Sequence, residues 1–344
     1  MRFSYIYGHE NAKKILKRAV ETKNVGHAYI FEGPFGVGKF SAALSFAAAL
    51  LCPHENGGDS CGECSTCKMC MAFSHPDLRI VTNQLYDSSK KSENLLTDTI
   101  RNMKREIYQK PSFADRKIYI IPNADSMNVS AQNSLLKILE EPPLYCTIIL
   151  IAQNASMFLD TILSRAVQVK FFPLSKDMVA KYLVEKGICK EEKAEIAASM
   201  ANGSIGEALK IAGDEEIIEL RNETVRHLMR ILNPAYVNMF DFSKFIKNNQ
   251  RSYKEIFSAI NIFLEDIIKI TEFNDKNGIL MKDKKDELEK FAGALTKGAA
   301  AELMDILIKT EMGIEQNVNY SLSVKMMIMD FWEVIHDRSH RSKI

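Results

Sequence analysis

Two hydrophobic patterns alternate along the first half of the chain. Across residues 11–22, apolar side chains recur every three or four positions, which predicts a helix. Residues 27–32 form a compact apolar run typical of a buried strand, and a glycine-rich turn and an apolar helix at 41–51 follow it. Similar patterns predict further helices at 97–109 and 128–141 and further strands at 117–121, 146–152 and 166–171.

Strands that alternate with helices in this way form a parallel sheet with helices on both faces. The first part of the chain, to about residue 170, is therefore predicted to be an α/β domain. After residue 175 the pattern predicts only helices, and these continue to the end of the sequence. The first three of them are short and are expected at 175–187, 191–201 and 204–213.

The charge of the chain is nearly balanced. Its 344 residues include 45 basic and 44 acidic side chains, which gives a formal net charge of +1. This balance argues against a protein that coats nucleic acid through bulk charge, although it is compatible with a local basic face. The N-terminal residues lack an apolar signal core, and the longest apolar stretch, at 42–52, is too short to cross a bilayer. We expect a cytoplasmic protein without a membrane partner.

A phosphate-binding loop is predicted between the first strand and the helix that follows it. Residues 33–39 (GPFGVGK) match G-x-x-x-x-G-K in the strand–turn–helix context that the motif requires. Gly33, Gly36 and Gly38 would let the backbone wrap the phosphates of a nucleotide, and Lys39 would reach the phosphate oxygens. These four residues form the candidate site for ATP.

Two parts of the ATPase chemistry are missing around this loop. Phe40 stands where a Ser or Thr hydroxyl would bind Mg²⁺, and Ser41 is displaced from that direction by about 100° around the helix. The second predicted strand runs into Pro122-Asn123 rather than into acidic residues, and Asp125 lies past its end. These losses argue against ATP hydrolysis by the chain. Weak nucleotide binding and an empty structural loop both stay open, and the empty loop is favoured.

Five of the seven cysteines fall within nineteen residues, which favours a metal site over disulfides in a chain without a signal sequence. Cys52, Cys61, Cys64 and Cys67 form C-x₈-C-x₂-C-x₂-C, and x₂ spacings let tight turns offer thiolates to a tetrahedral Zn²⁺. Four protein ligands would make this zinc structural. A second set replaces Cys52 with Cys70 and is similar to an iron–sulfur pattern, but its final gap does not fit. Zinc is therefore favoured, with Cys70 as an ordinary apolar residue.

Four stretches together resemble one family, the bacterial clamp-loader subunits, which belong to the AAA+ ATPases. They are HAYIFEGPFGVGK, the cysteine run, NSLLKILEEPP at 133–143 and ILSRA at 162–166. Many unrelated ATPases share the phosphate loop, whereas NSLLKILEEPP followed by a Ser-Arg motif is far more selective. The resemblance covers about residues 5–210. It implies an AAA+-like P-loop domain at 1–170 with a zinc module at 52–70, a helical lid at 171–213 and a helical oligomerisation domain at 214–344.

The chain departs from the motor subunits of this family at a third position. Motor subunits carry a nucleotide-sensing arginine in a G-S-x-R pattern, and residues 203–206 here read Gly-Ser-Ile-Gly. Glycine therefore stands where the arginine would be. With Phe40 and Pro122-Asn123, this difference implies a subunit that lacks ATPase activity of its own and serves as a component of the DNA polymerase III holoenzyme.

One element of the ATPase chemistry that acts on a neighbouring subunit is kept. Ser164-Arg165-Ala166 is similar to the Ser-Arg-Cys motif of the family. The resemblance implies that Arg165 projects into the ATP site of a neighbouring subunit, where its guanidinium stabilises phosphoryl transfer. Alternatively, Arg165 caps the sheet end or pairs with an acid. Lys137 would face the adjacent subunit by the same resemblance, or be a solvated lysine near Glu140.

The resemblance also implies partners. The family forms a ring-like pentamer, so the gamma/tau and delta subunits would bind this chain, and the sliding clamp and primed DNA would be reached through the complex. Four apolar residues of the C-terminal part fit one helix face, as interface or as core: Ile256, Ile260, Phe263 and Ile267. Two other functions stay open: an ATP-hydrolysing motor subunit with an unusual loop, and a zinc-bearing nucleic-acid binding module. No DNA-contacting residue can be named.

Overall fold

The computed structural model describes residues 2–86, 95–275 and 278–336. The chain divides into two compact units. The first contains Met1–Tyr182 with Gly203–Gly206, and the second contains Leu183–Asn202 with Glu207–Ile344. Each unit has its own buried apolar core. The predicted domain boundaries near residues 170 and 213 stay predictions.

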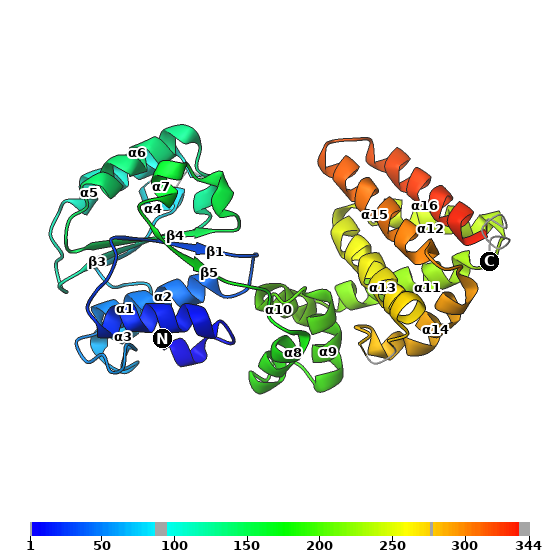
Figure 1. Ribbon diagram of the computed structural model, residues 1–344, viewed down its shortest axis with the longest axis horizontal. Helices are drawn as coiled ribbons and strands as arrows, with labels where there is room; N and C mark the ends of the chain where they lie inside the picture. Colours follow the sequence, from blue (N-terminus) through cyan, green and yellow to red (C-terminus); the bar gives the residue numbers. More distant parts are fainter. Residues whose placement is uncertain (1, 87–94, 276–277, 337–344) are drawn as a thin grey trace. The chain divides into compact units, whose positions relative to one another are not determined.

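The first unit is built on a five-stranded sheet in which every strand pair is parallel (Figure 1). The order of the strands is β2-β3-β4-β1-β5. Their bounds are β1 (Ala28–Glu32), β2 (Leu78–Ile80), β3 (Lys117–Ile121), β4 (Cys146–Ala152) and β5 (Val167–Lys170). The predicted α/β fold is therefore confirmed. The hydrophobic pattern does not predict β2, because three residues at a sheet edge are too few to show a period.

Helices cover both faces of this sheet. On one face lie α1 (Glu10–Glu21), α2 (Lys39–Leu51) and α3 (Ser65–Met71), and on the other lie α5 (Thr97–Ile107) and α6 (Val129–Glu140) (Figure 1). The shorter helices of the unit are η1 (Phe3–Tyr5), α4 (Asn83–Tyr86), η2 (Ala124–Ser126), η3 (Ala155–Met157) and α7 (Asp160–Leu163). Helix α2 is apolar on nearly every side and buried along almost its whole length, so it fixes the loop that precedes it.

The second unit is entirely helical in the residues that the structure describes. Helices α8 (Lys176–Glu185) and α10 (Ile205–Gly213) have residues in both units, and α9 (Glu191–Met200) lies in the second. These three agree with the short helices predicted from the sequence. The remaining helices are α11 (Glu215–Ile231), α12 (Tyr236–Asn248), η4 (Gln250–Ser252), α13 (Tyr253–Phe273), η5 (Lys282–Lys284), α14 (Lys285–Ala294), α15 (Ala299–Glu315) and α16 (Tyr320–His336). Within the described ranges, no helix has the length and apolar character needed to cross a bilayer.

Helix α13 forms the centre of the second unit. The four apolar residues that could have been interface or core are all fully buried: Ile256, Ile260, Phe263 and Ile267. They are therefore core. An ion pair also holds this unit together, since the buried Arg221 donates from its two terminal nitrogens to both carboxylate oxygens of the more exposed Asp283, at 2.8 and 2.7 Å.

Candidate functional site

The phosphate loop lies between the carboxyl end of β1 and the first turn of α2. Gly36 and Gly38 have φ angles of +71° and +107°, in the left-handed region that side chains with a Cβ rarely adopt. The loop glycines predicted from the sequence therefore serve its backbone conformation. Gly33 is the first residue after β1, and its amide continues the sheet by donating to the carbonyl of Ala152 at 3.2 Å.

The ammonium group of Lys39 is buried inside this loop. The residue is only 6% exposed, and Nζ donates to the backbone carbonyls of Gly33 and of Pro34, the latter at 2.5 Å. Burial lowers the pKa of Lys39, and the charge of Asp125 opposes part of that shift. The charge that a phosphate-binding lysine offers to a ligand is thus directed at carbonyls of its own chain.

Phe40 and Asp125, the two residues on which the sequence-based argument against a magnesium site rests, both have partners within the chain. Phe40 packs against the apolar core beneath the sheet, with its ring centre 6.3 Å from that of Phe73. Asp125, in η2 beyond the end of β3, accepts hydrogen bonds from the backbone amides of Gln153 at 2.7 Å and Asn154 at 3.4 Å. The side chain of Phe40 has no atom that binds a metal, and the carboxylate of Asp125 is hydrogen-bonded to backbone amides.

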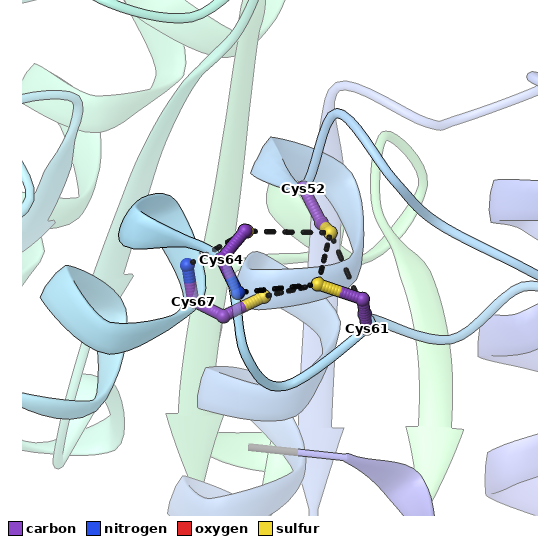
Figure 2. Close-up of side chains that lie close together, drawn as sticks. All are labelled: Cys52, Cys61, Cys64 and Cys67. Atoms are coloured by element: carbon purple, nitrogen blue, oxygen red, sulfur yellow. Dashed lines mark hydrogen bonds between the residues drawn. The ribbon is translucent and has the colours of Figure 1, made fainter.

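The structure brings the four predicted cysteine ligands together. The sulfur atoms of Cys52, Cys61, Cys64 and Cys67 all lie within 4.8 Å of one another, a group that could hold a metal ion (Figure 2). Three sulfur–sulfur distances are 3.6, 3.9 and 3.8 Å, between positions 52 and 61, 52 and 64, and 61 and 67. Cys70 lies outside this group and packs in the apolar core of the first unit. The alternative ligand set that includes it is therefore wrong.

Local structure explains how the cysteines converge. Cys52 ends α2, and Cys64 caps the N-terminus of α3 by accepting the amide of Cys67 at 3.4 Å. The amides of Cys61 and Cys64 likewise donate to the sulfurs of Cys52 and Cys61, at 3.5 and 3.4 Å. Backbone amides of Glu63 and Cys64 lower the pKa of Cys61 to about 6, whereas burial raises the pKa of Cys67 to about 12. A bound dication would favour the thiolate form of every member.

Asp59 connects the cysteine module to the N-terminal residues of the chain, and no sequence motif predicts this role. Its carboxylate accepts the backbone amide of Phe3 at 3.1 Å and lies 3.8 Å from the ammonium of Lys17. Arg2 also donates to the backbone carbonyl of Cys61. These contacts join residues more than forty positions apart, so no local pattern could have indicated them.

Arg165 lies on the turn between α7 and β5. Its side chain is 37% exposed, Nη1 donates to the carbonyl of Thr161 at 3.0 Å, and Nη2 lies 3.6 Å from Glu140. The pairing with an acid that the sequence left open is therefore present, but between exposed groups. Such a pair contributes at most about 1 kcal/mol, so it leaves the guanidinium available to another partner.

The sheet register places Arg165 and the phosphate loop at opposite ends of the sheet. Val167, two residues after Arg165, pairs with Tyr29 near the start of β1, and β1 and β5 run parallel. The loop begins at Gly33, beyond the other end of β1. At about 3.3 Å per residue, roughly six residues along the strand direction separate the two by about 20 Å. Arg165 therefore cannot serve the phosphate loop of its own chain.

Lys137 lies on α6 and lines a shallow hollow on the surface of the first unit. Arg101 and Lys104 of α5 line the same hollow. Glu140, which the sequence analysis offered as a neighbour for Lys137, lies instead next to Arg165. The role of Lys137 stays a prediction.

Comparisons with known proteins agree with these features. Residues 8–175 match the sequence profile of the family described as DNA polymerase III, delta subunit. The chain is 28% identical to DNA polymerase III subunit delta' of Bacillus subtilis, over 89% of this chain and 91% of that protein. It is 26% identical to subunit tau of the same organism, over 97% of this chain and 62% of that protein. It is 36% identical to subunit delta' of Pseudomonas aeruginosa, over 41% of this chain and 42% of that protein. The chain belongs to the clamp-loader family of DNA polymerase III subunits.

Proposed function

We propose that this chain is a non-hydrolysing, delta'-type subunit of the replicative clamp loader. In this role it helps to load the sliding clamp onto primed DNA and supplies Arg165 to the ATP site of a neighbouring subunit. The observation that carries the proposal is the separation of two cations across one sheet. Lys39 is buried among its own carbonyls, while Arg165 is exposed at the opposite end.

The chemistry of phosphoryl transfer supports this division of roles. Hydrolysis needs a metal ligand after the loop lysine and an acidic group at the neighbouring strand end. The ring of Phe40 packs against the core and has no metal ligand, and Asp125 accepts hydrogen bonds from backbone amides, so we infer that the chain offers neither. An arginine needs only to reach the transferred phosphate from outside, where its planar fork matches the oxygens. The exposed turn that carries Arg165 suits that task.

Zinc is the metal that we propose for the cysteine cluster. A tetrahedral site with Zn–S bonds of about 2.3 Å has sulfur–sulfur edges of about 3.8 Å. Three of the six sulfur–sulfur separations, 3.6, 3.9 and 3.8 Å, fit that geometry, and all six lie within 4.8 Å. Four thiolates would leave no open coordination position, so the ion would be structural. It would hold Cys61 and Asp59 in place and thereby the N-terminal residues that they bind.

The second unit supplies a surface for assembly with the gamma/tau and delta subunits. Helices α15 and α16 pack against each other, and each exposes large apolar side chains at helical spacing. Its members are Ile308, Met312, Leu322, Met326 and Met329, each more than 40% exposed. Exposed apolar residues that gather on neighbouring helices mark protein interfaces. On this proposal the clamp and DNA are reached through the assembled complex, and the cytoplasmic location stays an expectation.

A second function within the same family is an ATP-hydrolysing motor subunit. The identity with subunit tau, which extends over 97% of this chain, favours it. The positions of Phe40 and Asp125 argue against it. A zinc-bearing nucleic-acid binding module stays as the alternative of another class, and the cysteine cluster is the observation that favours it.

Reconstitution with the motor subunits, delta and the clamp tests the proposal. ATPase activity would be measured for this chain alone, for the complex without it and for the complete complex on primed DNA. We expect no Mg²⁺-dependent activity from the chain alone and the highest activity from the complete complex. Activity of the chain alone that Lys39→Ala removes would favour the motor subunit. Tight, salt-dependent DNA binding by the chain alone, lost with the cysteines, would favour the nucleic-acid binding module.

A further inference from the structure

Arg165 lies near the end of the crossover that connects β4 to β5, residues 153–166. The crossover contains α7, a helix of only four residues that lies beside α6 (Figure 1). A single helical turn is not stable by itself, so the orientation of α7 depends on its tertiary contacts. The contacts that fix α7 therefore also fix the backbone from which Arg165 projects.

The side chain of Gln132, on α6, holds the start of α7. It is only 4% exposed, and its amide nitrogen donates to the carbonyls of Met127 at 3.1 Å and Met157 at 3.0 Å. Its amide oxygen accepts the backbone amide of Leu159, the N-cap of α7, at 2.9 Å. Both amide hydrogens and the oxygen are thus engaged, and they join the segment before α6 to the crossover.

Backbone hydrogen bonds continue from Leu159 to Arg165. The carbonyl of Leu159 accepts the amides of Ile162 and Leu163, at 2.8 and 3.2 Å. The amide of Arg165 donates to the carbonyl of Ile162 at 3.1 Å, and its Nη1 donates to the carbonyl of Thr161 at 3.0 Å. A shift of Leu159 would therefore move both the backbone and the guanidinium of Arg165.

Apolar packing alone does not set this orientation. Phe158 and Ile162 are buried in the apolar core, but apolar contacts are non-directional and allow the short helix to rotate or slide. Hydrogen bonds to a buried amide have a narrow range of distance and angle. Asp125 and Glu32 fix the other end of the crossover, since they accept the backbone amides of residues 153–155. Gln132 fixes the end next to Arg165.

We infer that Gln132 is a positioning residue for Arg165: its amide fixes the start of α7 and thereby orients the guanidinium toward the ATP site of the neighbouring subunit. This role rests on the proposed function, in which Arg165 serves that site. Because Gln132 is buried, it acts through Leu159 and not on the nucleotide. A misplacement of about 1 Å at a reacting group can cost about 10²-fold in rate, so loss of the three hydrogen bonds should be measurable.

Replacement of Gln132 by an apolar residue of similar size tests this role. Gln132→Leu removes all three hydrogen bonds, and single-turnover ATP hydrolysis would be measured in the reconstituted complex on primed DNA. We expect a rate at least about tenfold below the wild type. The ATP concentration for half-maximal rate should stay within about twofold, because the neighbouring subunit binds that ATP.

Thr99→Val is the matched control for loss of a buried hydrogen bond. The hydroxyl of Thr99, on α5, donates to the side-chain oxygen of Asn83 at 2.7 Å, and Thr99 is 2% exposed. The variant loses this bond in the same compact unit but leaves the contacts of α7 in place. Its hydrolysis rate should stay within about twofold of the wild type.

A double-mutant cycle with Arg165→Ala separates positioning from a general loss of stability. Since Gln132 acts through Arg165, Gln132→Leu should lower the rate by less than about twofold in the Arg165→Ala background. In the wild-type background the same substitution should lower it at least about tenfold. A loss of rate through unfolding would instead be equal in both backgrounds.

Hydrogen exchange in the isolated chain gives a readout that needs no neighbouring subunit. The amides of residues 159–165 should exchange at least about five times faster in Gln132→Leu, whereas those of α2 should keep wild-type rates.

Leu159→Pro breaks one of the same hydrogen bonds from the other side. The φ angle of Leu159 is −62°, which proline adopts, but proline has no amide hydrogen to donate to Gln132. This variant should lower the rate in the same way, and it tests the role of Gln132 even if Gln132→Leu does not fold.

The outcomes separate this role from the proposed function. Full activity of Arg165→Ala would remove the proposed function and the role of Gln132 with it. A reduced rate for Arg165→Ala, together with wild-type rates for a folded Gln132→Leu or Leu159→Pro, would overturn the role of Gln132 alone. Equal losses from Gln132→Leu in both backgrounds of the cycle would overturn it as well.

Discussion

Lys39 and Arg165 are two cations at opposite ends of one sheet, and their surroundings differ. Lys39 is 6% exposed and bonded to backbone carbonyls at the carboxyl end of β1. Arg165 is 37% exposed before the first residue of β5, with one acidic neighbour at 3.6 Å. The charge of Lys39 is already compensated by hydrogen bonds to its own chain, so little of it is left to bind a ligand. The charge of Arg165 is exposed and only weakly paired, so it can interact with a neighbouring subunit. Under the proposed function, Lys39 belongs to a reaction that this fold has lost, and Arg165 serves the reaction of another subunit.

Removing the exposed cation is expected to have the largest effect. Arg165→Ala should lower single-turnover ATP hydrolysis at the neighbouring site by about 10³-fold, because the guanidinium no longer offsets the charge of the transferred phosphoryl group. Hydrolysis would be followed by rapid quench in the reconstituted complex. Arg165→Lys is the matched control, and it should recover only part of the rate, since it keeps the charge but loses the planar fork. An unchanged rate for Arg165→Ala would contradict the proposed role of Arg165 in the neighbouring ATP site.

Loss of the metal is expected to lower local stability around the phosphate loop and α2 more than around Arg165. Cys64→Ser should abolish stoichiometric zinc and lower the unfolding free energy by at least about 3 kcal/mol. The cluster lies at the end of α2, the helix that starts with Lys39, so hydrogen exchange should rise along α2 and less around Arg165.

Metal analysis and thermal unfolding would check this prediction. Cys70→Ala is the matched control, because it removes a buried cysteine of α3 that lies outside the cluster. It should keep the zinc and cost about 1 kcal/mol of stability for the lost packing. Full zinc content in Cys64→Ser would show that this cysteine is not a ligand.

Acidification is expected to lower the stability of the fold modestly through His9, which is bonded to the phosphate loop. Burial lowers the pKa of His9, which bonds the loop at Val37, so the folded chain binds fewer protons than the unfolded chain near that pKa. The contribution of His9 to stability is therefore complete above about pH 6.5 and is lost as the pH falls through the lowered value. His9→Asn suits the left-handed backbone of that position and does not titrate.

Thermal unfolding between pH 7.5 and 5.5 would measure the effect of His9. The wild type should lose more of its Tm on acidification than His9→Asn does, by a difference on the order of 1–2 °C. His75 and His227 also have lowered pKa values through burial, but they are common to both proteins and cancel in the difference. Equal losses would mean that His9 does not couple the loop to pH.

The smallest effect is expected from the buried cation. Lys39→Met should leave the ATPase rate of the reconstituted complex within about twofold of the wild type, because no phosphate depends on this lysine. A steady-state ATPase assay on primed DNA measures it. A loss comparable to that of Arg165→Ala would mean that the loop works in the reaction, and it would remove the contrast between the two cations.

Local sequence patterns predicted the features of this protein that depend on residues close together in the sequence. Long apolar runs indicated β1, β3 and β4, and x₂ spacing indicated the cysteine ligands that the structure brings together. The three-residue β2 was too short for a pattern. The contact of Gly206 with Gly36 and the bonds of Asp59 join distant positions, so they depend on tertiary packing that no local period records.

A structure of the assembled complex with a non-hydrolysable ATP analogue tests the central claim most directly. The account predicts that the guanidinium of Arg165 has left Glu140 and lies within about 3 Å of a terminal phosphate oxygen bound to the neighbouring subunit. It also predicts that the loop at Lys39 holds no nucleotide. Nucleotide in this loop, with Arg165 still paired to Glu140 and distant from every phosphate, would contradict it.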